Sequence, residues 1–407
     1  MQAKHILVLL LCSFLLACGE YEQETAPTNP LEEAFHLTRT TDNRLQIESQ
    51  ASEFKVFDAG LTSEITVDST GLLTVAPTDN QTPLLVISAG DTIRLAERHI
   101  QLEGSPNVRD VGGLFTEDGY QVKWGQIFRS GYLSELTEGD KNRLRPLKLS
   151  TIVDLRSEAE VESEPDQWPD MDQIQQVSLS IGDSNMTGGR MMEILQEKDF
   201  DADQFMYKAN QGFVTDYLDR YQKLFQLLLE AENYPLLYHC SAGKDRTGFA
   251  SVALLLALGV DSATAVHEYL SSNYYLHASN EERMEKAATF MGIDAKTLRP
   301  LMKVKAEFIQ GAFDAIRDEY GNMDAYLCEG LGICSMEREK LKEQLLYGYK
   351  RTICRDSLGI EIPCEKVTVQ SPVSGMDNFR ELELTGIKPG ILFRSDALYK
   401  VSQTDLA

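Results

Sequence analysis

The fold is decided by residues 235–258, which read PLLYHCSAGKDRTGFASVALLLAL. Residues 235–238 are typical of a short buried strand, and residues 247–258 form an apolar run long enough for a buried helix. The residues between them must lead from the strand into the helix. A loop in this place directs unpaired backbone N–H groups inward, and the helix dipole adds positive potential. The stretch therefore predicts a phosphate-binding loop.

This loop carries a nucleophile and a cation that binds anions. Cys240 sits where the N–H groups of the loop would stabilise a thiolate, and Arg246 offers a planar fork to two phosphate oxygens. Gly243 and Gly248 permit tight backbone geometry. A thiolate that faces a bound phosphorus can attack it, so these residues predict covalent phosphoryl transfer.

Strands alternate with helices over the rest of residues 100–347. Residues 151–156 and 177–181 are typical of strands, and residues 205–232 predict one long amphipathic helix. Three more helices are expected at residues 281–290, 303–320 and 336–347. This alternation favours an α/β domain with a mostly parallel sheet flanked by helices.

The decapeptide from His239 to Gly248 resembles the signature loop of protein tyrosine phosphatases, His-Cys-x5-Arg-Thr-Gly. Its Gly-Lys-Asp-Arg variant is similar to the bacterial branch that includes dual- and triple-specificity phosphatases. Residues 107–113, NVRDVGG, and the Phe-Arg-Ser run at 128–130, followed by residues 154–160, resemble the same branch. The resemblance spans residues 100–347 and implies the cysteine-phosphatase fold.

The resemblance also implies a role for each residue of the loop. Cys240 attacks the phosphorus and forms a cysteinyl-phosphate, and Arg246 binds the phosphate. Thr247 hydrogen-bonds the departing thiolate, and His239 orients the loop from behind. Substrate binding is assigned to Ser241, Ala242, Gly243, Lys244 and Gly248. No metal ion or cofactor is expected, because the backbone N–H groups and the arginine supply the positive charge.

Three aspartates compete for the role of general acid. In the branch that the loop resembles, the aspartate inside the loop has been proposed, and here it is Asp245. A salt bridge that only fixes the shape of the loop is the alternative for this residue. Asp183 follows the strand expected at 177–181, like the mobile-loop aspartate of dual-specificity phosphatases. Asp170 ends a Trp-Pro-Asp motif typical of larger tyrosine phosphatases, but it precedes that strand, so we interpret it as a decoy.

Other charged residues near these motifs have two interpretations. Lys244 either contacts a second phosphate, as in similar phosphatases that accept phosphoinositides, or is a solvated loop lysine. Arg109 with Asp110, and Asp154 with Arg156, are expected to form buried pairs that support the site.

The first residues predict an export signal. Residues 6–16 are an apolar run too short to span a bilayer. Leu15-Leu16-Ala17-Cys18 resembles a bacterial lipobox, in which Cys18 is lipidated; an ordinary signal peptide is the alternative. The glycine after this cysteine favours the outer membrane. We therefore expect a lipoprotein signal peptide at 1–18, a lipid anchor at Cys18 in the bacterial cell envelope, and a linker at 19–35.

Residues 36–98 predict a small β-sandwich, because short strand-like segments recur between turn clusters. The strands are expected at residues 45–48, 54–57, 65–67, 72–75, 84–88 and 92–95. This module contains no catalytic constellation, so we interpret it as a spacer or docking module ahead of a catalytic domain at 99–355.

Four late cysteines predict disulfides in an oxidising compartment. Among three connectivities we favour local pairing, Cys328 with Cys334 and Cys354 with Cys364; four free thiols are the alternative.

An internal repeat is expected at the end of the sequence. Residues 378–382 parallel 107–111, and residues 390–405 parallel 125–140. We interpret residues 372–407 as an incomplete second phosphatase-like unit that lacks a signature loop.

The composition excludes one class of partner. The 407 residues include 39 Lys+Arg and 63 Asp+Glu, a formal net charge of -24. Such a surface repels nucleic-acid backbones, and no basic patch offsets it. No nucleic-acid partner is therefore expected.

The sequence predicts an exported, lipid-anchored phosphatase that acts on phosphotyrosine, and also on phosphoserine or phosphothreonine, in proteins or peptides. A phosphoinositide or small phosphoester is the alternative substrate, and Lys244 is its indicator. An alternative of another class is a non-catalytic, ligand-binding surface lipoprotein. Intact Cys240, Arg246 and Thr247 argue against that class.

Overall fold

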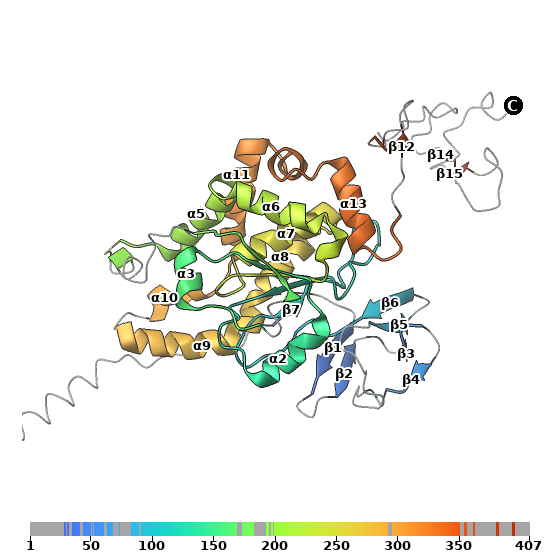
Figure 1. Ribbon diagram of the computed structural model, residues 1–407, viewed down its shortest axis with the longest axis horizontal. Helices are drawn as coiled ribbons and strands as arrows, with labels where there is room; N and C mark the ends of the chain where they lie inside the picture. Colours follow the sequence, from blue (N-terminus) through green and yellow to red (C-terminus); the bar gives the residue numbers. More distant parts are fainter. Residues whose placement is uncertain are drawn as a thin grey trace, which may run out of the picture. The chain divides into compact units, whose positions relative to one another are not determined.

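The computed structural model describes residues 91–168, 173–182, 199–291 and 295–350 without a break, and shorter stretches elsewhere between residues 28 and 394. The chain divides into two compact units, residues 1–351 and 352–407 (Figure 1). None of the helices within the described residues is both long and apolar enough to cross a membrane.

A five-stranded sheet lies at the centre of the first unit, in the order β10-β9-β11-β8-β7. The strands are β7 (Arg109–Asp110), β8 (Ile127–Ser130), β9 (Thr151–Asp154), β10 (Gln175–Ser178) and β11 (Leu236–His239). Four of them are parallel and β7 is antiparallel, which confirms the predicted mostly parallel sheet. Parallel strands end at a common edge, so His239 lies beside both Ser130 and Asp154. This edge positions the candidate site.

Alternate side chains of the strands enter two different hydrophobic clusters. On β11, Leu236 and Tyr238 belong to the larger cluster, whereas Leu237 belongs to the smaller one. On β9, Val153 and Ile152 divide in the same way. Successive residues of a strand point to opposite faces, so a sheet with apolar side chains on both faces must be covered on both.

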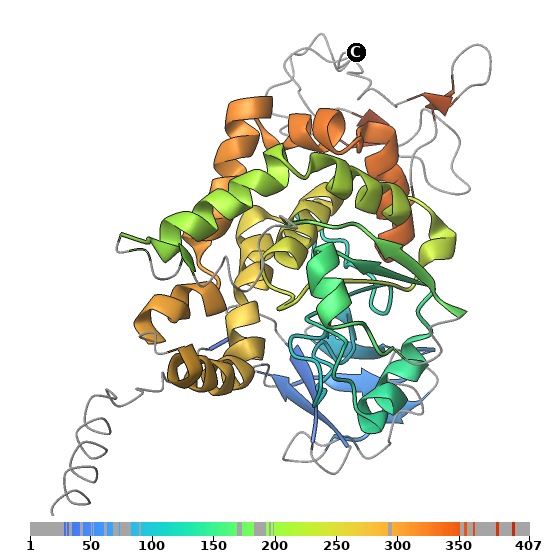
Figure 2. The same ribbon diagram turned by 60° about the vertical axis from the view of Figure 1, so that its left-hand side comes forward.

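Helices cover both faces of the sheet (Figures 1 and 2). The larger cluster is built with α5 (Ala202–Thr215), α6 (Leu218–Leu228), α7 (Arg246–Leu258), α8 (Ser262–Leu270), α11 (Ala306–Tyr320) and α13 (Ser335–Leu345). The smaller cluster is built with α2 (Glu138–Leu144) and η1 (Arg145–Leu147). The remaining helical elements are α3 (Glu158–Ser163), η3 (Ala231–Asn233), α9 (Ser272–Met291), α10 (Ala295–Met302), α12 (Met323–Ala325) and η4 (Tyr326–Gly330).

The single helix predicted over residues 205–232 is wrong, because the chain breaks between α5 and α6. The N–H of Tyr217 donates at 3.1 Å to a carbonyl five residues back, which ends α5. The break lets two aromatic rings contact one ring of α7. Phe213 and Tyr221 have centroids 5.8 and 4.8 Å from that of Phe249. Packing around α7 therefore overrides the continuous amphipathic pattern.

The N-terminal module contains two sheets that share one hydrophobic cluster. The first pairs β1 (Phe35–Arg39) with β2 (Leu45–Ser49), and the second has the order β4-β3-β5-β6. The strands of the second are β3 (Lys55–Phe57), β4 (Glu64–Ile65), β5 (Leu84–Ser88) and β6 (Asp91–Leu95). The predicted β-rich module is confirmed, although β1 was not expected as a strand. Of the strand predicted at 72–75, only Leu73 lies within the described residues, and it bridges to Val67.

One predicted disulfide is present. Cys328 of η4 is bonded to Cys334, the residue before α13, with a Cα–Cα distance of 4.1 Å. The predicted pairing of Cys354 with Cys364 involves a residue outside the described ones.

The second unit is described only as two antiparallel strand pairs. These are β12 (Cys354–Arg355) with β13 (Glu361–Ile362), and β14 (Arg380–Glu381) with β15 (Phe393–Arg394). The register of the latter pair matches that of β7 with β8: Arg380–Arg394 corresponds to Arg109–Arg129, and Glu381–Phe393 to Asp110–Phe128. An internal repeat would produce this equivalent register. The repeat itself stays a prediction.

A histidine with a lowered pKa lies between the module and the α/β domain. Burial and the charges of Arg109 and Arg143 lower the pKa of His99 from 6.5 to about 4. Between pH 6.5 and about pH 4, the folded state thus keeps His99 neutral, whereas in the unfolded chain His99 binds a proton. The stability that depends on neutral His99 is fully present above pH 6.5 and is lost as the pH falls towards 4.

We expect His99→Phe to remove this pH dependence while keeping a ring against Tyr275, whose centroid lies 4.6 Å away. Between pH 7 and pH 4, wild type should lose about 3 kcal/mol of unfolding free energy relative to the variant. Urea denaturation at both pH values measures the difference. If the difference in unfolding free energy between wild type and His99→Phe is the same at pH 7 and pH 4, the prediction is contradicted.

Candidate active site

The signature loop connects β11 to α7, so the predicted strand and helix on its two sides are both present. His239 ends the strand, Cys240 follows with 2% of its surface exposed, and Arg246 begins the helix. Gly243 has a φ of +66°, and a Cβ there would come within 2.3 Å of the carbonyl oxygen of Ser130. Only glycine permits this close approach of the loop to β8.

The carbonyl oxygens of the loop point towards the protein scaffold. The side chains of Asn107 and Arg129 donate to the carbonyl of Gly243 at 2.8 and 2.6 Å, and Asn107 also donates to that of Ala242. Among the backbone hydrogen bonds of the described residues, none is donated by the N–H groups of residues 241–245. These N–H groups therefore remain available to an anion at the N-terminus of α7.

The guanidinium of Arg246 is held by a carboxylate on α3. Its two terminal nitrogens donate to the two oxygens of Glu160 at 2.8 and 2.9 Å, and one also donates to the carbonyl of Ile181 at 2.9 Å. Burial would raise the pKa of Glu160, but the hydrogen bonds and charge of Arg246 hold it well below its usual range. Ser241 donates its hydroxyl to the same carboxylate. Sequence reasoning assigned Glu160 no role, although this residue lies in a segment that resembles the phosphatases.

Cys240 and Arg246 lie within electrostatic reach of each other. Burial would lower the pKa of Arg246, whereas the neighbouring Cys240 and the carboxylate of Glu160 raise it above its usual range. Burial raises the pKa of Tyr221, and Cys240 adds to that effect. The Tyr221 hydroxyl donates to the backbone carbonyl of Arg246 at 3.1 Å. The nucleophile and the phosphate-binding cation thus share one site.

His239 lies fully buried beside an acidic pair. Its Nε2 is 3.1 Å from Oδ2 of Asp166 and 3.8 Å from Oδ1 of Asp154. Arg156 donates to Asp154 at 2.7 Å and to Asp166 at 2.8 Å, so the predicted pair of Asp154 and Arg156 is present. Asp166 was not anticipated, since nothing near it in the sequence marks it.

The same group provides a candidate set of metal ligands. One ligand atom each from Asp154, Asp166 and His239 lies within 4.8 Å of the others. The guanidinium of Arg156 already contacts both carboxylates, and it supplies a positive charge where a cation would bind. We therefore interpret this group as support for the strand that leads into the loop.

The predicted pair of Arg109 and Asp110 is wrong. Arg109 donates instead to Glu268 of α8 at 2.7 Å, and Arg129 donates to the other oxygen of Glu268 at 2.5 Å; all three side chains are fully buried. Asp110 accepts two backbone N–H groups at 2.7 and 2.6 Å, and burial raises its pKa to about 6. Neighbouring residues of a strand point to opposite faces, so Arg109 and Asp110 cannot meet.

Of the three aspartates considered as the general acid, only Asp245 lies within the described residues. Asp245 lies at the N-cap of α7, with Oδ2 2.5 Å from Nζ of Lys244. Asp183 lies outside the described residues, but a Cβ on its neighbour Gly182 would lie 3.9 Å from a guanidinium nitrogen of Arg246. Asp170 also lies outside the described residues.

The remaining loop residues have distinct surroundings. Lys244 is only 6% exposed and also donates to the carbonyl of Lys303 at 3.2 Å, so the interpretation as a solvated lysine is wrong. The hydroxyl of Thr247 is buried and has no hydrogen-bond partner among the described residues. Gly248 packs against Tyr269, where a Cβ would approach the ring to 2.5 Å.

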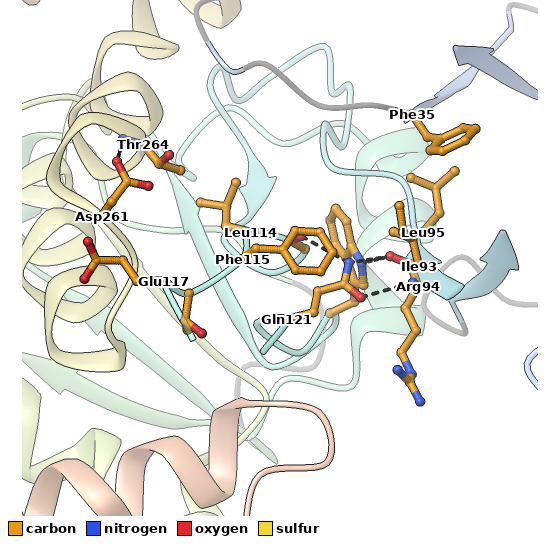
Figure 3. A pocket seen from close by; sticks show the side chains of 13 residues that line it. Phe35, Ile93, Arg94, Leu95, Leu114, Phe115, Glu117, Gln121, Asp261 and Thr264 are labelled. Atoms are coloured by element: carbon orange, nitrogen blue, oxygen red, sulfur yellow. Dashed lines mark hydrogen bonds between the residues drawn. The ribbon is translucent and has the colours of Figure 1, made fainter. Parts of the chain in front are cut away.

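A cavity of about 390 Å³ lies elsewhere, between the β-rich module and the α/β domain (Figure 3). Gln121 and Trp124 join the two parts there, because both donate to the carbonyl of Arg94, at 2.7 and 2.8 Å. Phe115, which is 43% exposed, lines the cavity. No residue of the signature loop lines it, so it is separate from the candidate active site.

A cysteine and an arginine on one loop, between a parallel strand and a helix, are the arrangement of the cysteine-phosphatase fold. Residues 100–347 match the model of the tyrosine phosphatase family, which is more than half of the chain. The chain belongs to this family and is a protein phosphatase.

Three relatives are similar to it. A Cupriavidus necator protein named as a tyrosine-protein phosphatase is 30% identical over 228 residues, which cover 56% of this chain and 82% of the relative. A tyrosine-protein phosphatase of Nostoc commune is 27% identical over 223 residues, 53% of this chain and 73% of the relative. The triple specificity protein phosphatase PtpB of Mycobacterium tuberculosis is 27% identical over 278 residues, 60% of this chain and 98% of the relative.

Proposed function

We propose that the chain hydrolyses phosphotyrosine, and with lower efficiency phosphoserine and phosphothreonine, in proteins or peptides through a cysteinyl-phosphate on Cys240. The observation that carries this proposal is the orientation of the loop. Asn107 and Arg129 bind its carbonyl oxygens, and the N–H groups of residues 241–245 remain free beside Cys240 and Arg246. Such a cradle binds a dianionic phosphate and the charge that develops in the transition state.

The reaction proceeds in two displacements. The Cys240 thiolate attacks phosphorus, the sulfur–phosphorus bond forms, and the bond to the tyrosine oxygen breaks as the general acid protonates that oxygen. Water then attacks phosphorus, its proton passes to the same carboxylate, and the thiolate leaves with phosphate as the product. Arg246 binds the phosphate throughout, with its guanidinium held by Glu160. Thr247 donates to the departing thiolate, and His239 supports the loop from below.

We propose Asp245 as the general acid, since it lies in the loop and next to Lys244. Asp245→Asn should lower kcat/KM for a phosphotyrosine peptide about 10²–10³-fold. The loss should be smaller for p-nitrophenyl phosphate, whose leaving group needs little protonation. Steady-state kinetics with both substrates measures this difference.

Asp183→Asn is the matched variant for the second candidate. If Asp183→Asn shows the substrate-dependent loss and Asp245→Asn does not, the assignment to Asp245 is wrong. An equal loss with both substrates in Asp245→Asn would instead indicate that this side chain fixes the loop through Lys244.

A phosphoinositide is the second candidate substrate, and the observation that favours it is the place of Lys244 inside the loop. Its ammonium contacts Asp245 and the carbonyl of Lys303, so it could meet a second phosphate only after it leaves these partners. Hydrolysis of a phosphotyrosine peptide, a phosphoserine peptide and a short-chain phosphoinositide tests the proposal, with chelator and reductant present. The highest kcat/KM for the phosphoinositide would overturn the proposed substrate class.

We also propose that Cys18 anchors the protein to a membrane, most simply the outer membrane of a bacterial cell. The lipobox-like run at residues 15–18 supports this proposal. Cys18→Ser should move the protein from the membrane fraction to the soluble fraction, which immunoblotting of the separated fractions measures. Membrane association that persists in the variant would contradict the anchor.

A further inference from the structure

The end of the predicted linker lies against the α/β domain. Leu31 is 4% exposed and belongs to the larger hydrophobic cluster. Oδ1 of Asn29 accepts the Ser271 hydroxyl at 2.8 Å, and its Nδ2 donates to the Tyr275 hydroxyl at 3.4 Å. Asn29 and Leu31, within the predicted linker, therefore pack against this domain.

The docking point is the junction of α8 and α9, which is fully buried at Ser271 and Ser272. The hydroxyl of Ser272 accepts from Arg109 at 3.2 Å. The ring of Tyr275, one turn further along α9, lies 5.0 Å from the guanidinium carbon of Arg109. Asn29 thus contacts Ser271 and Tyr275, and the ring of Tyr275 in turn contacts Arg109.

Arg109 is part of the network that supports the signature loop. It shares Glu268 with Arg129, and Arg129 donates to the carbonyl of Gly243 at 2.6 Å. Arg109 also donates to Asn107, whose amide binds the carbonyl of Gly243. Both routes from Arg109 end on the same loop carbonyl, so a displacement of Arg109 changes both supports together.

We propose that Asn29 is a positioning residue of the phosphatase. Its docking on the α8–α9 junction keeps Arg109 in place and thereby keeps the signature loop in its phosphate-binding form. This proposal rests on the proposed function of that loop. Asn29 is half-buried, whereas Arg109, Glu268 and Arg129 are fully buried. In a buried and closely packed network, the loss of one anchor shifts the next side chain. Asn29 is then part of the support of the signature loop.

Two readouts on the full chain test the role of Asn29. Asn29→Ala should lower kcat/KM for p-nitrophenyl phosphate about threefold to tenfold, the effect of one net hydrogen bond. The affinity for inorganic phosphate, measured by titration calorimetry, should fall by a similar factor, because the loop itself is altered. Asn29→Asp keeps the acceptor for Ser271 and should restore both values.

Thr40→Ala is the matched control. It removes two exposed hydrogen bonds between the Thr40 hydroxyl and the backbone of Arg44, both at 3.0 Å, within the N-terminal module. This variant should keep wild-type kinetics and phosphate affinity. If Asn29→Ala lowers only the melting temperature, as a merely structural contact would, the proposal is overturned.

The calorimetric readout separates this proposal from the proposed function. If wild type hydrolyses none of the substrates but binds phosphate, the proposed function fails, and the affinities of Asn29→Ala and Asn29→Asp still decide the positioning role. Unchanged phosphate affinity in Asn29→Ala overturns the positioning role, whatever the activity of wild type.

Discussion

Cys240→Ser should lower kcat for a phosphotyrosine peptide by at least about 10⁴-fold, the largest loss of activity expected from one substitution. A serine hydroxyl has nearly the same size but is not ionised at neutral pH, so the attacking group is lost while the cradle stays. The N–H groups of residues 241–245 and the guanidinium of Arg246 remain in place. The variant should therefore still bind inorganic phosphate. Steady-state kinetics and calorimetry together measure both properties.

The two disulfide-bonded cysteines offer a control for this substitution. Cys328 and Cys334 form a disulfide between η4 and α13. Their joint replacement by serine should leave kcat nearly unchanged at 25 °C, since neither thiol is free to attack. Residual activity in Cys240→Ser above about 1% of wild type would contradict the covalent mechanism.

Glu268→Ala should cause the largest loss of stability. Glu268 is the shared partner of Arg109 and Arg129, and all three side chains are fully buried. Burial would raise the pKa of Glu268, but the charges of Arg109 and Arg129 and the hydrogen bond from Arg109 hold it below its usual range. Removal of the carboxylate leaves two buried guanidinium groups without their counter-charge. Such a change costs about 3–5 kcal/mol of unfolding free energy.

Urea denaturation measures this loss, and Glu268→Gln provides a variant of the same shape in case the alanine variant does not fold. The glutamine keeps an oxygen that accepts a hydrogen bond but has no charge. The unfolding free energy of Glu268→Gln should therefore lie between that of wild type and that of Glu268→Ala. Glu138→Gln is the matched surface control, because Glu138 pairs with Lys141 at 2.9 Å and is 77% exposed. That variant should lose little stability, because water screens an exposed ion pair. Similar losses for Glu268→Gln and Glu138→Gln would contradict the role of the buried charges.

The stability that Glu268 provides also has a defined pH window. A carboxylate whose pKa is lowered in the folded state contributes above its ordinary value of 4.5, and the contribution is lost as the pH falls below it. The loss of unfolding free energy in Glu268→Gln should therefore diminish at acidic pH.

The central strand, the loop and the helix that follows it could be predicted from their own residues. The determinants of this unit are consecutive residues, 235–258, and each acts on its immediate neighbours in the chain. One local signal outside this stretch was also sufficient, because Cys328 bonds to a cysteine six residues away, as predicted.

The tertiary structure alone decided which charged groups meet. Glu160 binds an arginine 86 residues away, and Glu268 binds Arg109 across 159 residues. Asp110, next to Arg109 in sequence, faces the other side of its strand. A residue's type shows that it needs a partner when buried, but not which distant residue the fold brings to it. The strand–loop–helix unit can therefore be predicted from its own residues. The charged residues that hold it form their contacts only after the sheet and the helices have packed.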